Sequence, residues 1–208
     1  MKFLNSNKTL CLSPHPDDAE YSISATVEKC SDTIFEIVCL SNSGKNDKSG
    51  AYDRKQECVD YWKGYTNVNV RFADTEYIQD KSFEKWVEYL EQYVSSSKCD
   101  TLLVPTAIDS HNDHQYINSL ANPALRVSNC SLIEYRTPST LDGWEPNYFV
   151  DVQSLLDKKA TQLIKAFVSQ RHRIYFQPEH IKAFHTNFQC IKKGMPFTEQ
   201  FKIIKLYS

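Results

Sequence analysis

Short apolar runs alternate along this chain with longer segments in which apolar residues recur at helical spacing. The apolar runs show no alternation of polar and apolar residues, which is typical of strands that helices cover on both faces. The spacing of the intervening segments indicates amphipathic helices. The pattern predicts strands at residues 9–13, 34–40, 68–72, 101–105 and 131–135, and helices at residues 19–29, 53–65, 82–95 and 115–127.

Strands that alternate with helices predict βαβ units and a mostly parallel sheet. Because 208 residues is an ordinary length for one domain, we expect residues 1–208 to form a single α/β domain. Its fold would be Rossmann-like and doubly wound, with helices on both faces of the sheet. The expected strand order is 3-2-1-4-5 plus edge strands.

The pattern changes after the fifth predicted strand. Residues 136–146 have the composition of a loop, and residues 148–152 are expected to form an edge strand. Two further helices are predicted at residues 154–167 and 178–193. Residues 41–50 are polar and contain glycine, which predicts a mobile loop.

Charge and composition exclude several classes of protein. Lys plus Arg number 24 and Asp plus Glu number 26, a formal net charge of -2, so nothing indicates a nucleic acid or an anionic membrane as partner. No apolar stretch approaches the ~20 residues of a membrane span, and the N-terminus has no signal-peptide core. We therefore expect a cytoplasmic protein. The oligomeric state stays open, and a homo-oligomer is compatible with the sequence.

The seven cysteines are expected to be reduced. Their number is odd, and Cys11, Cys39 and Cys130 lie in apolar runs, where cysteine behaves as a small hydrophobic residue. Because no Cys-x-x-Cys pair is present, a thiolate metal site is not expected.

Segments rich in histidine and aspartate follow the first and fourth predicted strands. Residues 14–18 read Pro-His-Pro-Asp-Asp, and residues 111–114 read His-Asn-Asp-His. In a sheet ordered 3-2-1-4-5 these two strands are neighbours, and their connections leave toward opposite faces, which opens a crevice at their carboxyl ends. We therefore expect the two segments to meet where such folds bind ligands.

The residue types in these segments are those that hold catalytic zinc, which takes three protein ligands from His and Asp or Glu and keeps one position open. His15 and Asp18 could supply two ligands, and His114 could supply the third. The first segment by itself is also compatible with a simple turn that leads into a helix, because short motifs match by chance. The meeting of both segments in one crevice is what favours the metal site.

The remaining polar residues of the two segments suit supporting chemistry. His111 lies three residues before His114 on the same helix face and could donate a proton. Asp17 could act as general base toward a water, or could merely cap the following helix. Asp113 could accept a hydrogen bond that fixes an imidazole tautomer. Glu20, in the first turn of a helix, suits the helix dipole and is expected to support the site without reacting.

The two motifs resemble those of the PIG-L/LmbE family of zinc-dependent N-acetylglucosaminyl deacetylases. Pro-His-Pro-Asp-Asp-Ala-Glu at residues 14–20 is similar to the family's first motif, and His-Asn-Asp-His at residues 111–114 is similar to its second. Further similarities follow in the family's order along most of the chain: Arg54 with Glu57, residues 148–152, Lys158 and Lys159 with Ser169 and Gln170, and Glu199 with Phe201.

The resemblance implies a reaction and roles for individual residues. The ligands of a single zinc ion would be His15, Asp18 and His114. Asp17 would be the general base that activates the attacking water, and His111 would stabilise the tetrahedral intermediate or protonate the leaving amine. The reaction would be hydrolysis of the N-acetyl group of a 2-acetamido sugar or its conjugate, which would be a small-molecule substrate.

Two residues outside the motifs are candidates for substrate binding. The resemblance implies that Arg54 contacts a phosphate or a sugar hydroxyl, and a surface arginine at a charged helix start is the alternative. Trp144 lies in a loop after the fifth strand, where the family's substrate-contacting loop also lies. It could stack on a sugar ring.

The chain departs from the family pattern at three places. Ser-Ile-Ser-Ala-Thr at residues 22–26 replaces a glycine-rich stretch, so a ligand would approach the backbone there less easily. Asn112 replaces a proline, and Asp109 replaces a tyrosine that some members carry. The alternative functions are a non-catalytic sugar-binding or regulatory protein on the same scaffold, and an amidase for a non-sugar acetamide. Loss of a ligand or of the base would favour the first alternative, but all of them are present.

Overall fold

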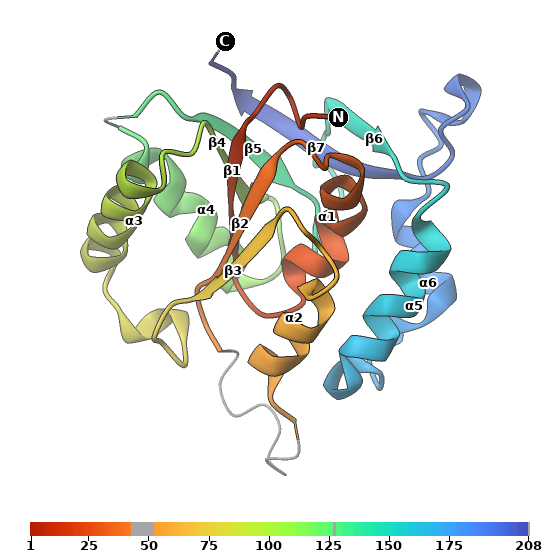
Figure 1. The fold of residues 1–208 in the computed structure, drawn as a ribbon, viewed down its shortest axis with the longest axis horizontal. Coiled ribbons are helices and arrows are strands. Elements are labelled where there is room, and N and C mark those ends of the chain that lie inside the picture. The colour runs from red at the N-terminus through yellow and green to blue at the C-terminus, as the bar shows by residue number, and fades with distance from the viewer. Residues whose placement is uncertain (43–51, 127, 208) are drawn as a thin grey trace.

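The computed structural model describes residues 1–42, 52–126 and 128–207, in which a seven-stranded sheet lies between two layers of helices (Figure 1). The strands are β1 (Lys8–Ser13), β2 (Ile34–Cys39), β3 (Val68–Phe72), β4 (Thr101–Pro105), β5 (Ser131–Tyr135), β6 (Tyr148–Asp151) and β7 (Thr198–Lys205). The α-helices are α1 (Asp18–Lys29), α2 (Arg54–Trp62), α3 (Phe83–Ser97), α4 (Asn112–Ala124), α5 (Leu156–Ala166) and α6 (Pro178–His185). Most of the mobile loop predicted at residues 41–50 lies outside the described residues.

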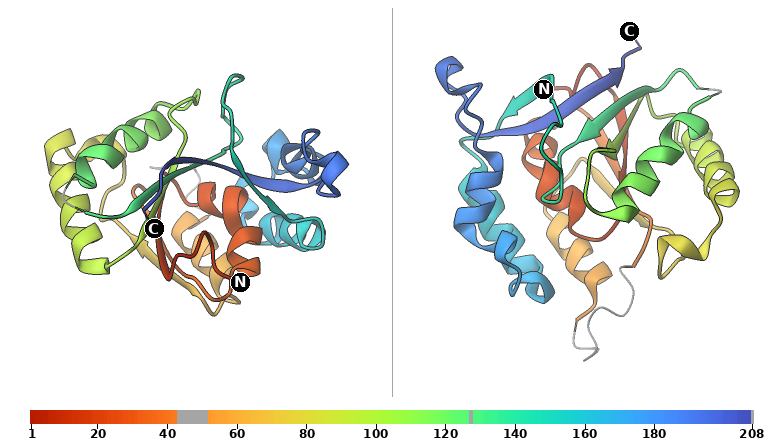
Figure 2. Two further views of the ribbon diagram at one scale, coloured as in Figure 1. Left: turned by 90° about the horizontal axis from the view of Figure 1, so that it is seen from above. Right: turned by 180° about the vertical axis from the view of Figure 1, so that it is seen from behind.

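The sheet has the strand order β3-β2-β1-β4-β5-β7-β6, which confirms the predicted order of the first five strands. β1 pairs in parallel with both β2 and β4, so the carboxyl ends of β1 and β4 lie side by side. Helices α1, α2 and α5 cover one face of the sheet and α3 and α4 cover the other, as Figure 2 shows. The doubly wound α/β architecture is therefore confirmed.

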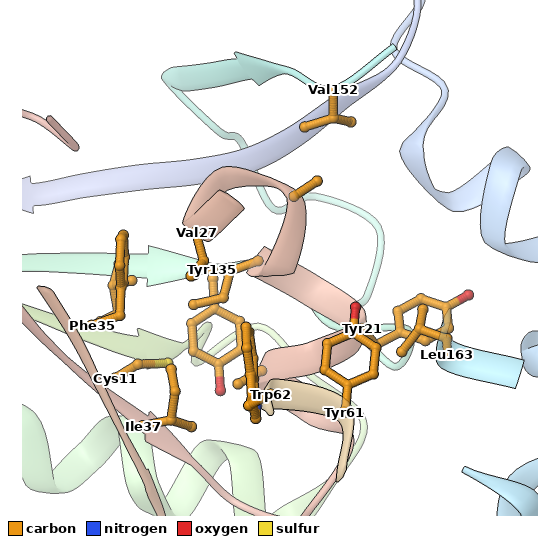
Figure 3. Packing of buried hydrophobic residues seen from close by; sticks show 14 of the residues in the cluster. Cys11, Tyr21, Val27, Phe35, Ile37, Tyr61, Trp62, Tyr135, Val152 and Leu163 are labelled. Atoms are coloured by element: carbon orange, nitrogen blue, oxygen red, sulfur yellow. The ribbon is translucent and has the colours of Figure 1, made fainter. Parts of the chain in front are cut away.

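Side chains of β1 alternate between two hydrophobic clusters, one beneath each helical layer. Cys11 belongs to the cluster beneath α1, α2 and α5, together with Phe35 and Tyr135 (Figure 3). Leu10 and Leu12 belong to the opposite cluster, beneath α3 and α4. Because both faces of β1 are buried, the strand forms an unbroken apolar run in the sequence.

The prediction was incomplete at the C-terminal end of the sheet. β6 forms the expected edge strand, but β7, which the apolar pattern did not predict, lies antiparallel between β5 and β6. The helix predicted at residues 178–193 is wrong beyond His185, where α6 ends. Asn187 donates its backbone N–H to the carbonyl of Pro196 at 2.8 Å, so the chain turns back toward β7 instead of continuing the helix.

A buried charged cluster fastens β7 to the helical layer. The Lys159 ammonium of α5 donates to the Glu199 carboxylate of β7 and lies 2.9 Å from Nε2 of His185. Glu199 also accepts the backbone N–H of Ala25 at 3.0 Å and that of Thr26 at 2.6 Å, both in α1. Lys159, Glu199 and His185 are all buried, so one strand and three helices (β7 with α1, α5 and α6) meet at one set of polar contacts.

The same contact explains the segment at residues 22–26 that lacks glycine. Ser22, Ser24 and Ala25 are buried, and their small side chains leave room for Glu199 to reach the backbone of α1. The group that approaches the backbone here is thus a carboxylate of the same chain, not a ligand. The replacement of the glycine-rich stretch by residues 22–26 is therefore accommodated where α1 packs against β7.

The cysteines and the helices of the described residues test two expectations from composition. All seven cysteines are free, as expected, and most of them are buried. No helix in residues 1–42, 52–126 or 128–207 is both long and apolar enough to cross a membrane.

Candidate metal centre

His15, His111 and His114 come together at the carboxyl ends of β1 and β4. His15 closely follows β1, His111 caps the N-terminus of α4, and His114 lies in the first turn of that helix. The ring centroid of His114 lies 5.8 Å from that of His15 and 4.6 Å from that of His111, on which it stacks. The expectation that the two segments meet in one crevice is confirmed.

Asp18 lies at the centre of this group. Its Oδ2 atom is 3.1 Å from Nδ1 of His15 and 3.3 Å from Nε2 of His114. The same oxygen accepts the backbone N–H of His15 at 3.0 Å. Asp18 and His114 are buried, and His15 exposes only 13% of its side chain. One carboxylate oxygen therefore stands between two imidazoles that come from different motifs.

The other ring nitrogen of each imidazole is held by a further carboxylate. Nε2 of His15 lies 3.0 Å from Oδ2 of Asp113, and Nδ1 of His114 lies 3.1 Å from Oδ2 of Asp109. Gln79 donates to the second oxygen of Asp113 at 2.7 Å. Carboxylates in this position orient the imidazoles that bind metal ions and fix their tautomers.

His15, Asp18 and His114 fit a divalent cation by their contacts and their chemistry. Nε2 of His114 is buried and makes no hydrogen bond of regular geometry among the described residues, since Oδ2 of Asp18 contacts it only as an ion-pair partner at 3.3 Å. The distances from Asp18 to the two ring nitrogens, 3.1 and 3.3 Å, match the separation of about 3.4 Å between neighbouring ligands of a tetrahedral zinc ion. Two imidazoles and one carboxylate are also a donor set that catalytic zinc uses.

The three imidazoles form a second possible set of ligands. His15, His111 and His114 each offer a ring nitrogen, and these atoms lie within 4.8 Å of one another. Nδ1 of His111, however, accepts the backbone N–H of Asp113 at 3.2 Å. In the neutral ring Nε2 then carries the proton. A ring in that tautomer is a hydrogen-bond donor, which suits proton transfer better than metal binding.

The carboxylates make the crevice attractive for cations. Burial lowers the pKa of His15, but hydrogen bonds to Asp113 and Asp18 outweigh it and raise this pKa to about 9. Burial also lowers the pKa of His114, and the charge of Asp18 with the hydrogen bond to Asp109 raises it to about 10. At neutral pH both rings therefore carry a proton that a metal cation would displace.

Asp17 lines the crevice in a strained backbone conformation. Its φ angle of 129° is rare for a residue that has a side chain. The Glu20 carboxylate accepts the Asp17 N–H at 3.0 Å, and it is itself bound by the Cys58 thiol at 2.9 Å and by the Trp62 indole. Glu20 is completely buried. It therefore holds the turn between β1 and α1 that presents Asp17 to the crevice.

Asp17 and Arg54 form an ion pair beside the imidazoles. Arg54 Nη2 lies 2.7 Å from Oδ2 of Asp17 and donates to the carbonyl of Pro16 at 2.6 Å. Burial raises the pKa of Asp17, the charge of Arg54 lowers it and that of Asp18 raises it again, which leaves it at about 6. Asp17 is thus ionised at neutral pH, but it accepts a proton more readily than an ordinary aspartate.

A cavity of about 260 Å³ opens over these residues. His15, Asp17, Asp18, Arg54, His111 and His114 all line it, so the structure brings together most of the residues that the sequence singled out. The opposite wall comes from the segment after α5, which contributes Gln170, Arg173, Tyr175 and Phe176. The metal candidates are therefore accessible to a small molecule.

Asp109, Thr137 and Arg173 are site residues that sequence reasoning missed. The Thr137 hydroxyl donates to Oδ2 of Asp109 at 2.5 Å, behind His114. The available signal for Asp109 was its position two residues before His111, because the loop before a helix is a common place for a residue that orients a ligand. Thr137 and Arg173 lie in loop segments without a motif, so no local signal marked them.

The structure does not bring Trp144 to this cavity. Its indole N–H donates to Oε2 of Glu134 at 3.1 Å, and the ring lines a separate cavity of about 300 Å³ together with Leu141 and Phe188. The loop at residues 136–146 places the ring against β5 instead of over the histidines. Tyr175, with Tyr21 beside it, and Phe176 are aromatic residues that line the cavity over the metal candidates.

Several solved structures share this fold. The N,N'-diacetylchitobiose deacetylase of Pyrococcus horikoshii is 19% identical, with a TM-score of 0.78 over 97% of this chain and 85% of that one. The 4-carboxy-2-hydroxymuconate hydratase of Pseudomonas putida is 16% identical, with a TM-score of 0.79 over 100% of this chain and 98% of that one. The zinc-inhibited form of a teicoplanin deacetylase is 12% identical, with a TM-score of 0.72 over 93% of this chain and 96% of that one. At these identities the likeness shows a common fold alone.

Sequence comparison identifies the family to which the chain belongs. No curated protein matches the chain. The sequence profile of the PIG-L family, described as GlcNAc-PI de-N-acetylase, matches residues 10–125, more than half of the chain and the part that holds both histidine motifs. The chain therefore belongs to the PIG-L family.

Proposed function

We propose that the protein is a zinc-dependent hydrolase that removes the N-acetyl group from a 2-acetamido sugar or its conjugate. The observation that carries the proposal is the position of Asp18, whose Oδ2 atom contacts the imidazoles of His15 and His114. These residues belong to the two motifs within the matched region of the family. The description of that family, a de-N-acetylase, supports the class of reaction.

The fold by itself does not select the reaction. A deacetylase and a hydratase resemble this chain almost equally, with TM-scores of 0.78 and 0.79. Family membership and the acidic and basic groups around the imidazoles are what favour hydrolysis of an amide. The roles of individual residues follow from their contacts.

In this proposal His15, Asp18 and His114 hold the cation, while Asp113 and Asp109 orient the two imidazoles from outside. Zinc bound there would supply Lewis acidity, which lowers the pKa of water and polarises an amide carbonyl. The buried setting of Asp18 and His114 strengthens these electrostatic effects because little water screens them.

Asp17 acts as the general base toward the attacking water. It lines the cavity beside Asp18, and its pKa of about 6 leaves it ionised at neutral pH yet able to take up a proton. The ion pair with Arg54 fixes the orientation of the carboxylate. Arg54 thereby contributes to the reaction whether or not it also touches the substrate.

His111 acts as the hydrogen-bond donor toward the reacting carbonyl group. Its Nδ1 accepts the N–H of Asp113, so Nε2 carries a proton in the neutral ring. Nε2–H can stabilise the oxyanion of the tetrahedral intermediate, and the proton that Asp17 takes from the water can pass to the leaving amine. Burial and the charges of His15 and His114 lower the pKa of His111, so the ring stays neutral at neutral pH and keeps Nε2–H as a hydrogen-bond donor.

Two other functions are open to experiment. A non-catalytic sugar-binding or regulatory protein would need none of the base chemistry, yet Asp17 is present and held in a strained conformation. An amidase for a non-sugar acetamide would use the same residues on another substrate. The proposal includes a cytoplasmic location, which the seven free cysteines support because reducing compartments keep thiols unpaired.

The direct test measures zinc content by elemental analysis and acetate release from a panel of N-acetylglucosamine conjugates and simple acetamides. Asp17→Asn should lower turnover about 10²- to 10⁴-fold, the usual contribution of a general base, and should retain zinc. Asp142→Asn removes an exposed carboxylate outside the cavity and should change neither quantity. Zinc binding without acetate release from any compound would favour the non-catalytic alternative.

A second pair of variants distinguishes the two possible sets of metal ligands. His114→Ala should lower zinc affinity strongly, because it removes the imidazole whose Nε2 has no other partner. His111→Ala should lower turnover more than zinc affinity. The reverse pattern would mean that His111 binds the metal and that its assignment as hydrogen-bond donor is wrong.

A further inference from the structure

Two arginines line the cavity over the candidate metal residues, and only one of them is paired. Arg54 binds Asp17 at 2.7 Å and the carbonyl of Pro16 at 2.6 Å. Arg173 reaches the same cavity from the chain after α5. Within the described residues no carboxylate or other acceptor forms an ion pair or hydrogen bond with its guanidinium; its Nε atom is buried without a partner, as is the Nε atom of Arg54.

The protein holds Arg173 in a defined position. Its backbone N–H donates to the carbonyl of Gln170 at 2.9 Å, and its carbonyl accepts the N–H of Phe176 at 3.0 Å. The guanidinium carbon lies 5.8 Å from the ring centroid of Tyr175, close enough for a cation–π contact. Two successive turns and an aromatic side chain thus position a guanidinium that makes no ion pair or hydrogen bond within the described residues.

The unpaired guanidinium has the properties of a binding site for an anion. Arginine stays protonated at physiological pH, and its planar fork of N–H groups matches the oxygens of a carboxylate or a phosphate. Buried donors without partners are rare in folded proteins and call for an explanation. Asp17 lines the same cavity and feels the charge of Arg173, but its Oδ2 atom is bound to Arg54 at 2.7 Å, and no hydrogen bond joins it to Arg173 among the described residues.

We infer that Arg173 binds an oxyanion substituent of the substrate, a phosphate or a carboxylate, and that the protein prefers acidic N-acetylated compounds to neutral ones. The inference rests on the proposed function where it concerns the N-acetyl group of the substrate. The binding of an oxyanion is argued from Arg173 alone. Arg173 is then a specificity residue. Arg54 orients Asp17, and the two arginines have separate tasks in one cavity.

The test compares the binding of amine products, which the enzyme cannot hydrolyse, by isothermal titration calorimetry on the zinc-loaded protein. The probes are glucosamine, glucosamine 1-phosphate, glucosamine 6-phosphate and muramic acid, which carries a carboxylate. At least one acidic probe should bind about 10- to 100-fold more tightly than glucosamine, as expected for a hydrogen-bonded charge pair. The phosphates and muramic acid then show which oxyanion the site accepts.

Arg173→Gln should abolish this preference, and Arg173→Lys should keep part of it, because lysine retains the charge but not the fork. Arg171→Gln is the matched control. It removes the same charge two residues away, where the side chain donates to the carbonyls of Ile164 and Lys165 and does not line the cavity. The Arg171 variant should bind the probes like the wild type.

Equal affinity for glucosamine and all three acidic probes, or a preference that Arg173→Gln leaves intact, would overturn the inference. Acetate release from N-acetylglucosamine and from the acetylated acidic probes is measured on the same proteins. Turnover without any difference between neutral and acidic substrates would leave the proposed function standing and refute the role of Arg173. A binding preference that depends on Arg173, without turnover of any substrate, would support the role of Arg173 and contradict the proposed function.

Discussion

Two sites in this protein place histidines in opposite surroundings. His15 and His114 lie among the carboxylates of Asp18, Asp109 and Asp113, which raise the pKa values of both rings. One ring nitrogen of His114 has no hydrogen-bond partner in the described part of the chain, and the cavity reaches it. This site has more negative charge than the protein itself neutralises, so it favours a cation.

His185 lies at the other site, between α6 and β7. Its Nδ1 donates to the carbonyl of Ile181 at 2.7 Å, and its Nε2 lies 2.9 Å from the Lys159 ammonium. Burial and then the charge of Lys159 hold its pKa well below the usual value. Both ring nitrogens have partners, and Glu199 balances the lysine. A buried histidine is therefore a sign of metal binding only when carboxylates, and not a cation, surround it.

The largest effect on stability is expected from Lys159→Met. The change leaves the Glu199 carboxylate buried without its cation, which should lower the free energy of unfolding by about 3–5 kcal/mol. Lys158→Met is the matched control, because the neighbouring lysine makes an exposed pair with Glu28 that is worth less than about 1 kcal/mol. Urea denaturation of both variants measures the difference. Similar losses would show that the buried cluster is not what fastens β7.

A smaller effect, on metal affinity, is expected from Asp109→Asn. The variant keeps a hydrogen-bond acceptor for Nδ1 of His114 but loses the charge, which should weaken zinc binding about 10- to 100-fold. The free energy of unfolding of the metal-free protein should change less than in Lys159→Met. Titration with a competing chelator gives the affinity. Unchanged zinc binding would mean that Asp109 merely anchors the loop through Thr137.

The two sites should also respond to pH with opposite signs. The pKa of His185 is lowered in the folded state, so the unfolded chain binds more protons below its pKa of about 6.5, and stability is lost as the pH falls. The pKa values of His15 and His114 are raised to about 9 and 10, so their contribution in metal-free protein is complete below pH 6.5 and is lost as the pH rises through those values.

Urea denaturation of metal-free protein from pH 5 to pH 10 tests both signs. The difference between wild type and His185→Gln isolates the acid side, because every other group is common to the two proteins. The difference between wild type and His114→Gln isolates the alkaline side in the same way. Each difference in free energy of unfolding is followed as a function of pH. If both differences change in the same direction as the pH rises, the contrast between the surroundings of His185 and those of His15 and His114 is mistaken.

Much of this molecule could be predicted from local pattern. Mostly apolar runs identified the central strands β1 and β4 because helices cover both of their faces. The prediction of a run without alternation was wrong for β3, in which apolar residues alternate with exposed Asn69 and Arg71 at the edge of the sheet. The order of the first five strands then followed from the restricted ways in which βαβ units connect. That order brought His15 and His114 to one crevice, where the structure places them.

What only the tertiary structure decided depends on contacts between distant segments. β7 forms because its backbone pairs with β5 and β6, and Glu199 reaches the backbone of α1 about 170 residues earlier in the chain. The pairing of Arg54 and the lack of a partner for Arg173 also depend on which acceptors the folded chain brings within reach. Periodicity and motifs report the environment along the chain, whereas the charge balance of a cavity is set by side chains that meet only after folding.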